Sequence, residues 1–233
     1  MKFSNRFKMT VAALALAVAG SAQATITYQS NPAPGTVIPG VATYQTTGAM
    51  MDNMSITANF TGGFSQTLYW ADTGLISGGV TGTGWSLSQS GDTFGGNWVF
   101  SDTRQGSLLS LVLDGNTGYT LFDRTFNGNS GTPGSANGWS FDSDTFDGWF
   151  FDPDVTVTYS DRVALTGQAA VGDLWQVMTL NFGTDGFSGR FSFIQDTDND
   201  IRATQVPEPG MLSLIGLALA GLGFTVRKRK TLA

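Results

Sequence analysis

The sequence predicts an all-β protein: an antiparallel β-sandwich with jelly-roll-like connections, between an N-terminal signal peptide and a C-terminal transmembrane sorting helix. Short segments with alternating apolar and polar residues recur along residues 25–205, and glycine-containing turns separate most of them. Helical signals are scarce there, and the acidic residues of this body are all aspartates, which favour turns over helices.

The clearest strands have a period of two, which directs one row of side chains toward a core. They are Ile56–Phe60, Val155–Tyr159, Met178–Phe182 and Phe191–Phe193. Further strands are expected at Thr25–Gln29, Val41–Thr46, Thr67–Ala71, Trp85–Gln89, Trp98–Ser101, Leu108–Leu113, Tyr119–Phe122, Trp139–Phe141, Trp149–Phe151 and Leu174–Met178. Breaks such as Asp114-Gly115-Asn116 supply the positive φ that hairpin turns require.

Residues 25–205 are expected to form one domain. A body of about 181 residues can bury one sizeable core without disulfides, and the chain has no cysteine. The loop at 127–138 has no apolar residue larger than alanine and proline, so we expect a surface excursion within the sandwich and no domain boundary.

Residues 1–24 have the order of a cleaved signal peptide. Three cations at 2–8 precede an apolar core at 11–19, and Ala22 and Ala24 fit a small-x-small cleavage site before Thr25. The apolar core is too short to span a membrane. We therefore expect the Sec translocon and signal peptidase as partners and a mature chain that begins at Thr25.

The last 28 residues contain three segments in a defined order. The motif at 206–210 is stiff and extended, because proline fixes φ and keeps the preceding residue out of the α region. The apolar stretch at 211–226 would form a transmembrane helix of about 24 Å, short for a hydrocarbon core of roughly 30 Å. The basic tail at 227–233 keeps the end on the cytoplasmic side. The motif consists of Val206, Pro207, Glu208, Pro209 and Gly210, and the basic cluster of Arg227, Lys228, Arg229 and Lys230.

This order resembles the PEP-CTERM sorting domain of Gram-negative surface and exopolysaccharide-associated proteins. The resemblance covers 28 of 233 residues and rests on Pro207–Pro209, the apolar stretch and the basic cluster. It implies transient anchoring in the inner membrane and processing near the motif by an exosortase, a membrane-embedded cysteine protease or transpeptidase. The alternative is an ordinary C-terminal anchor after a proline-rich linker.

The body between the two terminal segments is strongly acidic. It has 17 Asp, five Arg and neither Glu nor Lys, a net charge of −12. This charge repels nucleic acid, which we do not expect as a partner, and attracts divalent cations. Because the chain lacks His and Cys, catalytic triads, Cys–His pairs and imidazole zinc sites are excluded. Glycoside hydrolysis by two aspartates remains possible.

Two groups of aspartates have the hard oxygen ligands that calcium prefers, and we expect no cofactor unless these groups bind calcium. Asp196, Asp198 and Asp200 alternate as at the start of an EF-hand loop. A complete EF-hand is rejected, because Ile201 replaces the turn glycine and Pro207 the bidentate glutamate. The second group contains Asp142, Asp144 and Asp147. The alternative for both groups is a solvated acidic turn.

Two tryptophans, Trp139 and Trp149, adjoin acidic residues and glycines and could stack on a pyranose face. The alternative for each is a place in the core. We expect a non-enzymatic protein, a structural or adhesive component of the cell surface or biofilm matrix. The second hypothesis is a calcium-dependent carbohydrate-binding module that contacts exopolysaccharide, and the third is a glycosidase with a carboxylate pair.

Overall fold

The computed structural model describes residues 24–29, 34–124, 131–135, 137–147 and 155–205. The predicted signal peptide up to residue 23, Trp149 with its predicted strand, the motif at 206–210, the apolar stretch at 211–226 and the basic tail at 227–233 lie outside these residues. In the part that is described, no helix is both long and apolar enough to span a membrane.

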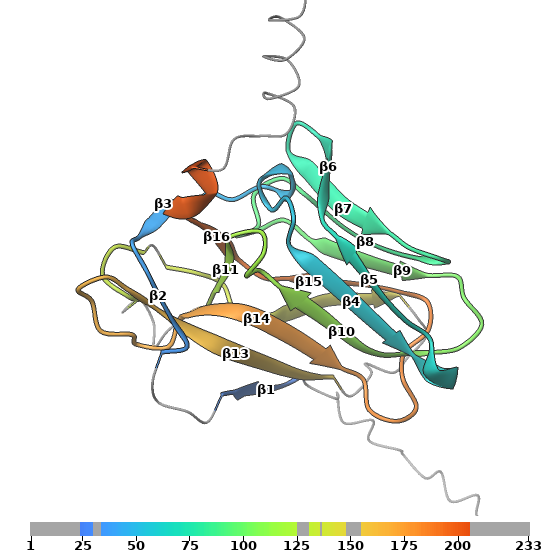
Figure 1. Ribbon diagram of the computed structural model, residues 1–233. Helices are drawn as coiled ribbons and strands as arrows, with labels where there is room; N and C mark the ends of the chain where they lie inside the picture. The colour runs from blue at the N-terminus through green and yellow to red at the C-terminus, as the bar shows by residue number, and fades with distance from the viewer. Residues whose placement is uncertain (1–23, 30–33, 125–130, 136, 148–154, 206–233) are drawn as a thin grey trace, which may run out of the picture.

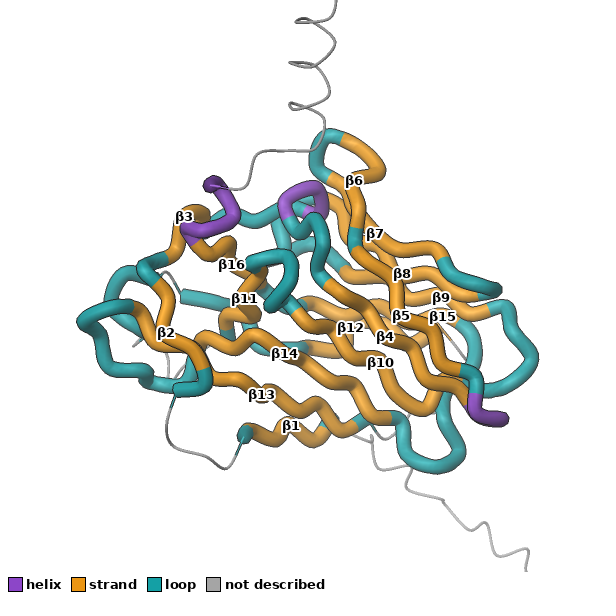
Figure 2. Tube along the Cα trace, in the orientation of Figure 1, coloured by secondary structure: helices purple, strands orange, loops and turns teal. Residues whose placement is uncertain are grey.

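The described residues form two β-sheets that pack as a sandwich, as Figures 1 and 2 show. This architecture confirms the predicted all-β sandwich. The first sheet contains β1 (Thr25–Tyr28), β2 (Thr36–Ile38), β3 (Val41–Thr43), β4 (Ser55–Phe60), β5 (Ser65–Tyr69), β10 (Leu108–Asp114), β11 (Thr120–Asp123), β13 (Thr156–Leu165), β14 (Leu174–Asn181) and β16 (Thr197–Asp200). The second contains β6 (Ala71–Gly74), β7 (Ser77–Thr81), β8 (Trp85–Ser90), β9 (Trp98–Asp102), β12 (Asp142–Asp147) and β15 (Arg190–Ile194). Three short 3-10 helices are η1 (Gly48–Met50), η2 (Thr61–Gly63) and η3 (Ile201–Gln205).

Most neighbouring strands pair antiparallel. The second sheet has the order β12-β15-β9-β8-β7-β6, and the main path of the first is β3-β16-β11-β14-β10-β4-β5, with β13 beside β14. β1 and β2 pair parallel with β13, so Thr25, the expected first mature residue, begins a strand. The consecutive strands β6 to β9 are neighbours in an up-and-down order, which differs from the jelly-roll-like connections that we expected.

The apolar core lies between the sheets and follows the period-two pattern. In β4, Ile56, Ala58 and Phe60 are buried, whereas the residues between them are only partly covered. Aromatic rings from β9 and β15 stack in pairs, Trp98 on Phe193 at 5.7 Å and Phe100 on Phe191 at 5.1 Å between ring centroids. The alternating segments therefore fold as predicted because each buries one apolar row.

Two acidic segments that were expected to be loops or turns are strands. β12 contains Asp142, Asp144 and Asp147 and pairs with β15. β16 lies between β11 and β3, and all four of its residues, Thr-Asp-Asn-Asp, are buried. A buried strand of polar residues breaks the usual pattern of apolar burial, and it positions the candidate site described next.

Candidate functional site

Three aspartates converge where β11 meets β16. In the antiparallel register Leu121 lies opposite Asp198, and beyond the end of the ladder the amide of Asp123 donates to the carbonyl of Asp196 at 3.1 Å. Asp196 and Asp198 are two residues apart and therefore on the same side of their segment. One carboxylate oxygen from each of Asp123, Asp196 and Asp198 lies within 4.8 Å of the other two. The pairing of two segments far apart in the sequence thus builds a three-carboxylate cluster.

A fourth carboxyl group, that of Asp173, lies close enough to raise the pKa of Asp123 and of Asp198 through its charge. All four side chains are buried, with at most 2% of their surface exposed. We call Asp123, Asp173, Asp196 and Asp198 the acidic corner. Of the four, Asp196 and Asp198 were among the predicted metal ligands.

Hydroxyl groups contact the acidic corner from two connecting segments. The Ser135 Oγ lies 3.2 Å from Asp123 Oδ2 and 3.1 Å from Asp198 Oδ2. The Thr93 hydroxyl donates to Asp196 Oδ1 at 3.0 Å. The amide and the hydroxyl of Thr132 donate to the Asp173 carboxylate at 2.5 and 2.6 Å. Two oxygens, Asp123 Oδ1 and Asp198 Oδ1, are buried without a hydrogen-bond partner among the described residues.

Burial shifts the ionisation of the corner. It raises the pKa of Asp123 to about 9, and the charges of Asp198, Asp173 and Asp196 add to this effect. Burial and then the charge of Asp198 raise the pKa of Asp196 to about 8, against the hydrogen bond from Thr93. Burial raises the pKa of Asp198 to about 7, although its hydrogen bond with Ser135 lowers it. Carboxylates buried together must either hold protons or bind a cation.

Gln195 connects the backbone of the acidic corner to side chains of the apolar core. Its Nε2 donates to the carbonyls of Asp123 at 2.9 Å and of Asp196 at 2.7 Å. Its Oε1 accepts from the Tyr159 hydroxyl, and its own carbonyl accepts from Trp98 Nε1 at 2.9 Å. Two large core side chains therefore fix the segment that bears the carboxylates.

The segment 131–135 belongs to the predicted surface excursion at 127–138, but it packs against the sandwich. Thr132 is fully buried on Asp173, and the carbonyl of Gly134 accepts a hydrogen bond from the Tyr44 hydroxyl at 2.9 Å. Sequence reasoning missed this because the contacts are polar, and a search for apolar residues finds nothing in such a segment.

The other predicted metal ligands lie elsewhere. Asp200 is buried, and its carboxylate accepts from the amide of Arg202 at 2.9 Å and from Arg202 Nε at 2.6 Å. Asp142 is exposed on β12, and Asp144 and Asp147 are on the same strand. Asp123 and Asp173 were missed, since neither stands in an acidic run. The structure therefore divides the group Asp196, Asp198 and Asp200 and adds Asp123 to its first two members.

Trp139, one of the two predicted sugar-stacking residues, is 42% exposed. Its ring meets that of Phe94, itself 43% exposed, edge to face with a centroid distance of 5.7 Å. The Trp139 carbonyl accepts from the amide of Asp196 at 3.0 Å, so this aromatic pair lies directly beside the acidic corner. The other predicted stacking residue, Trp149, lies outside the described residues.

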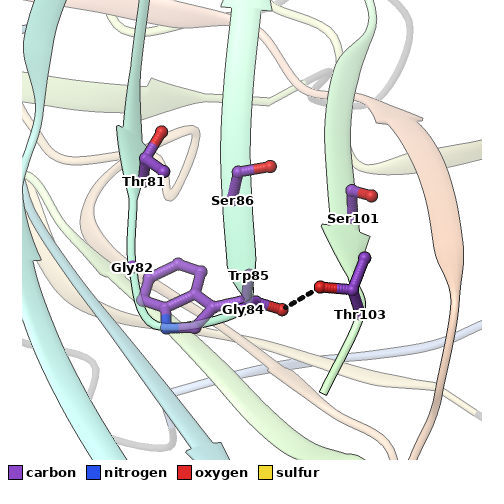
Figure 3. A pocket seen from close by; sticks show the side chains of 7 residues that line it. All are labelled: Thr81, Gly82, Gly84, Trp85, Ser86, Ser101 and Thr103. Carbon is purple, nitrogen blue, oxygen red and sulfur yellow. Dashed lines mark hydrogen bonds between the residues drawn. The ribbon is translucent and has the colours of Figure 1, made fainter.

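A small pocket of about 220 Å³ opens near the ends of β7, β8 and β9 (Figure 3). Its lining consists of Thr81, Gly82, Gly84, Trp85, Ser86, Ser101 and Thr103. The Thr103 hydroxyl donates to the Gly84 carbonyl at 3.3 Å, and Trp85 is only 3% exposed. The pocket is smaller than the roughly 300 Å³ at which ligand sites usually begin, and its lining residues carry no ionisable group.

The family model of the PEP-CTERM protein-sorting motif matches residues 205–230. The match confirms the resemblance drawn from the motif, the apolar stretch and the basic cluster, and it indicates export and C-terminal anchoring for cleavage by an exosortase. The body of the chain lies outside the matched residues. No curated protein and no solved structure matches the chain.

Proposed function

We propose that this exported protein is a non-enzymatic structural or adhesive component of the cell surface or extracellular matrix. The sorting motif at 205–230 carries the proposal, because such a motif directs a protein to the cell envelope. The body that it would direct there is a β-sandwich with a large aromatic core. The buried position of the acidic corner supports a non-enzymatic role, since a carboxylate pair for glycoside hydrolysis must face a cleft that admits the sugar.

The proposal is tested in the cells that produce the protein. A strain lacking the chain is complemented with the unchanged chain or with the triple variant Pro207→Ala, Glu208→Ala and Pro209→Ala. We expect the unchanged chain to restore cell aggregation and matrix retention, and the variant to stay in the inner-membrane fraction without restoring either.

A matched control uses another Pro-x-Pro segment of the chain, Pro32-Ala33-Pro34, which is not followed by an apolar stretch. Pro32→Ala with Pro34→Ala should leave surface location and aggregation unchanged. Aggregation that does not depend on the chain at all would contradict a structural or adhesive role, even if sorting proceeds as expected.

The second candidate function is carbohydrate binding, and the exposed pair Trp139 and Phe94 favours it. An aromatic ring held on a rigid sandwich can stack on the apolar face of a pyranose. Because the body carries a net charge of −12, a neutral polysaccharide suits this surface better than an anionic one. Calcium dependence would follow if the acidic corner positions Trp139 through the hydrogen bond from Asp196.

Binding of the full chain to polysaccharide from the producing cells tests this second function. We expect Trp139→Ala to lower the affinity by about tenfold or more. The control Tyr69→Ala removes another exposed aromatic ring, on β5, and should leave the affinity unchanged. Equal affinities for the two variants would show that the aromatic pair is not the binding site.

A further inference from the structure

Two carboxylate oxygens of the acidic corner have no hydrogen-bond partner among the described residues. The Ser135 hydroxyl has one proton but contacts two carboxylates, those of Asp123 and Asp198. One of these contacts therefore places oxygen against oxygen unless a carboxyl proton or a bound cation lies between them. The unpartnered Asp123 Oδ1 and Asp198 Oδ1 belong to the same two side chains, which are 99% buried.

Among the described residues, none of the charges that shift the pKa values of Asp123, Asp196 and Asp198 belongs to an arginine. Arg202 is hydrogen-bonded to Asp200, and the Arg124 guanidinium lies over the Tyr28 ring at 4.0 Å. The Arg104 guanidinium lies over the Phe64 ring at 3.6 Å. The groups that act on the three clustered carboxyls are other aspartates, hydroxyls and a backbone amide.

We propose that Asp123, Asp196 and Asp198 form a calcium site, with the Ser135 hydroxyl as a further oxygen ligand. This site does not rest on the proposed structural or adhesive role. It keeps Asp196 and Asp198 of one group that the sequence suggested and replaces Asp200 with Asp123. It joins the end of β11, the start of β16 and the segment 131–135, three parts of the chain that are distant in sequence.

The chemistry of the donors selects the ion. All the candidate ligands are oxygen atoms, whereas zinc in proteins favours nitrogen and sulfur, and the chain has neither His nor Cys. Magnesium usually keeps several waters and takes only one or two carboxylates, which does not suit three carboxylates in a closed site. Calcium binds roughly six to eight oxygen ligands and accepts them in irregular arrangements.

The site is tested by titrating calcium chloride into the full chain, purified in detergent and stripped with EDTA. We expect one saturable site per chain, with a dissociation constant between about 10⁻⁶ and 10⁻³ M. Saturating calcium should raise the midpoint of thermal unfolding by about 5–10 °C. A flat titration at millimolar calcium, with no shift in the midpoint, would overturn the proposal and leave protons as the partners of these carboxyls.

The double variant Asp123→Asn and Asp198→Asn keeps the shape of the corner and removes two charges. We expect it to fold, to unfold in EDTA at the same temperature as the unchanged chain or higher, and to lose the response to calcium. The control Asp142→Asn alters an exposed aspartate on β12 and should bind calcium normally. Binding that persists in the double variant but disappears in the control would place the ion at β12 and refute the assignment.

Two further measurements sharpen the assignment. A Cβ atom at Gly138 would lie 2.5 Å from both the carbonyl carbon and the Cγ of Asp123, so Gly138→Ala should displace this residue, with its carboxylate, and weaken calcium binding by about tenfold or more. Magnesium chloride at equal concentration should produce a much smaller rise in the unfolding midpoint. An equal response to both ions would overturn the choice of calcium.

Discussion

The aromatic core around Phe100 and the acidic corner around Asp198 are equally closed to solvent, with 0% and 1% of these side chains exposed, yet their chemistry is opposite. In the core, burial itself is favourable, by roughly 1.5–3 kcal/mol for a large apolar side chain. In the corner, each buried oxygen without a partner costs about 1–3 kcal/mol. The first region should stabilise the fold under most conditions, whereas the second stabilises it only when protons or a cation balance the charge.

The largest expected effect separates the core from the corner. Phe100 is fully buried and stacks on Phe191 and, at 6.2 Å, on Trp85. Phe100→Ala should lower the free energy of unfolding by about 3–5 kcal/mol, measured with urea. The loss should be the same in EDTA and in calcium, because Phe100 packs against aromatic rings of the core. A loss that depends on calcium would show that the two regions are not separate.

The second-largest expected effect is the pH dependence of the free energy of unfolding, which should come from the acidic corner. The folded pKa values of Asp123, Asp196 and Asp198 lie above the ordinary 3.8, so folding takes up protons between that value and about 9. In EDTA the contribution of these groups is therefore fully present near pH 4 and is lost as the pH rises toward 9, a change of about 2 kcal/mol or more.

Urea unfolding at a series of pH values measures how the free energy of unfolding changes with pH. The pH dependence should be retained in Phe100→Ala. It should be much weaker in Asp123→Asn with Asp198→Asn, because of the three shifted carboxyls the double variant keeps only the buried Asp196. Stability that rises with pH across this range in EDTA would contradict the described ionisation.

Tyr159 lies at the junction of the two regions, and removing its hydroxyl should have an intermediate effect. That hydroxyl donates to Gln195 Oε1 and accepts from the amide of Phe141 at 3.0 Å. Tyr159→Phe leaves both partners buried and should lower the free energy of unfolding by about 1–3 kcal/mol.

Because Gln195 also holds the backbone of Asp123 and Asp196, Tyr159→Phe should weaken calcium binding as well. Calorimetric titration checks this, with the exposed Tyr69→Phe as the control. Unchanged stability and unchanged affinity together would mean that the core does not position the corner.

The smallest effect is expected at Asp200, whose partner Arg202 is 37% exposed. Asp200→Asn should change the free energy of unfolding by about 1 kcal/mol or less, since water screens the ion pair on the arginine side. Calcium affinity should change by less than about twofold, because the variant leaves the corner intact. A complete loss of calcium binding would restore Asp200 to the ligand group in which the sequence placed it.

Local patterns account for what the sequence could predict. β4 and β15 were predicted because alternation within one strand is visible without knowing its neighbours. The proximity of Asp196 and Asp198 follows from the same period of two. Asp123 could not be found in this way, because it reaches the site through the register of β11 against β16, which depends on the whole sheet.

The polar strand β16 and the tryptophans show that residue type alone does not predict which side chains are buried. The sequence Thr-Asp-Asn-Asp of β16 has turn composition, yet hydrogen bonds within a sheet hold it as a buried strand. Trp98 is fully buried and Trp139 is 42% exposed, although Trp98 follows an asparagine and Trp139 a glycine in the sequence. Their surroundings in the fold decide between core and surface.

The acidic corner ties distant segments together as a crosslink would, in an exported chain that has no cysteine. A disulfide needs an oxidant to form and a reductant to break. A tie made by an ion opens when the ion is withdrawn and closes when it returns, with no covalent chemistry. If the proposed calcium site forms, the fold of this chain would stiffen or loosen with the calcium content of its surroundings, without new protein synthesis.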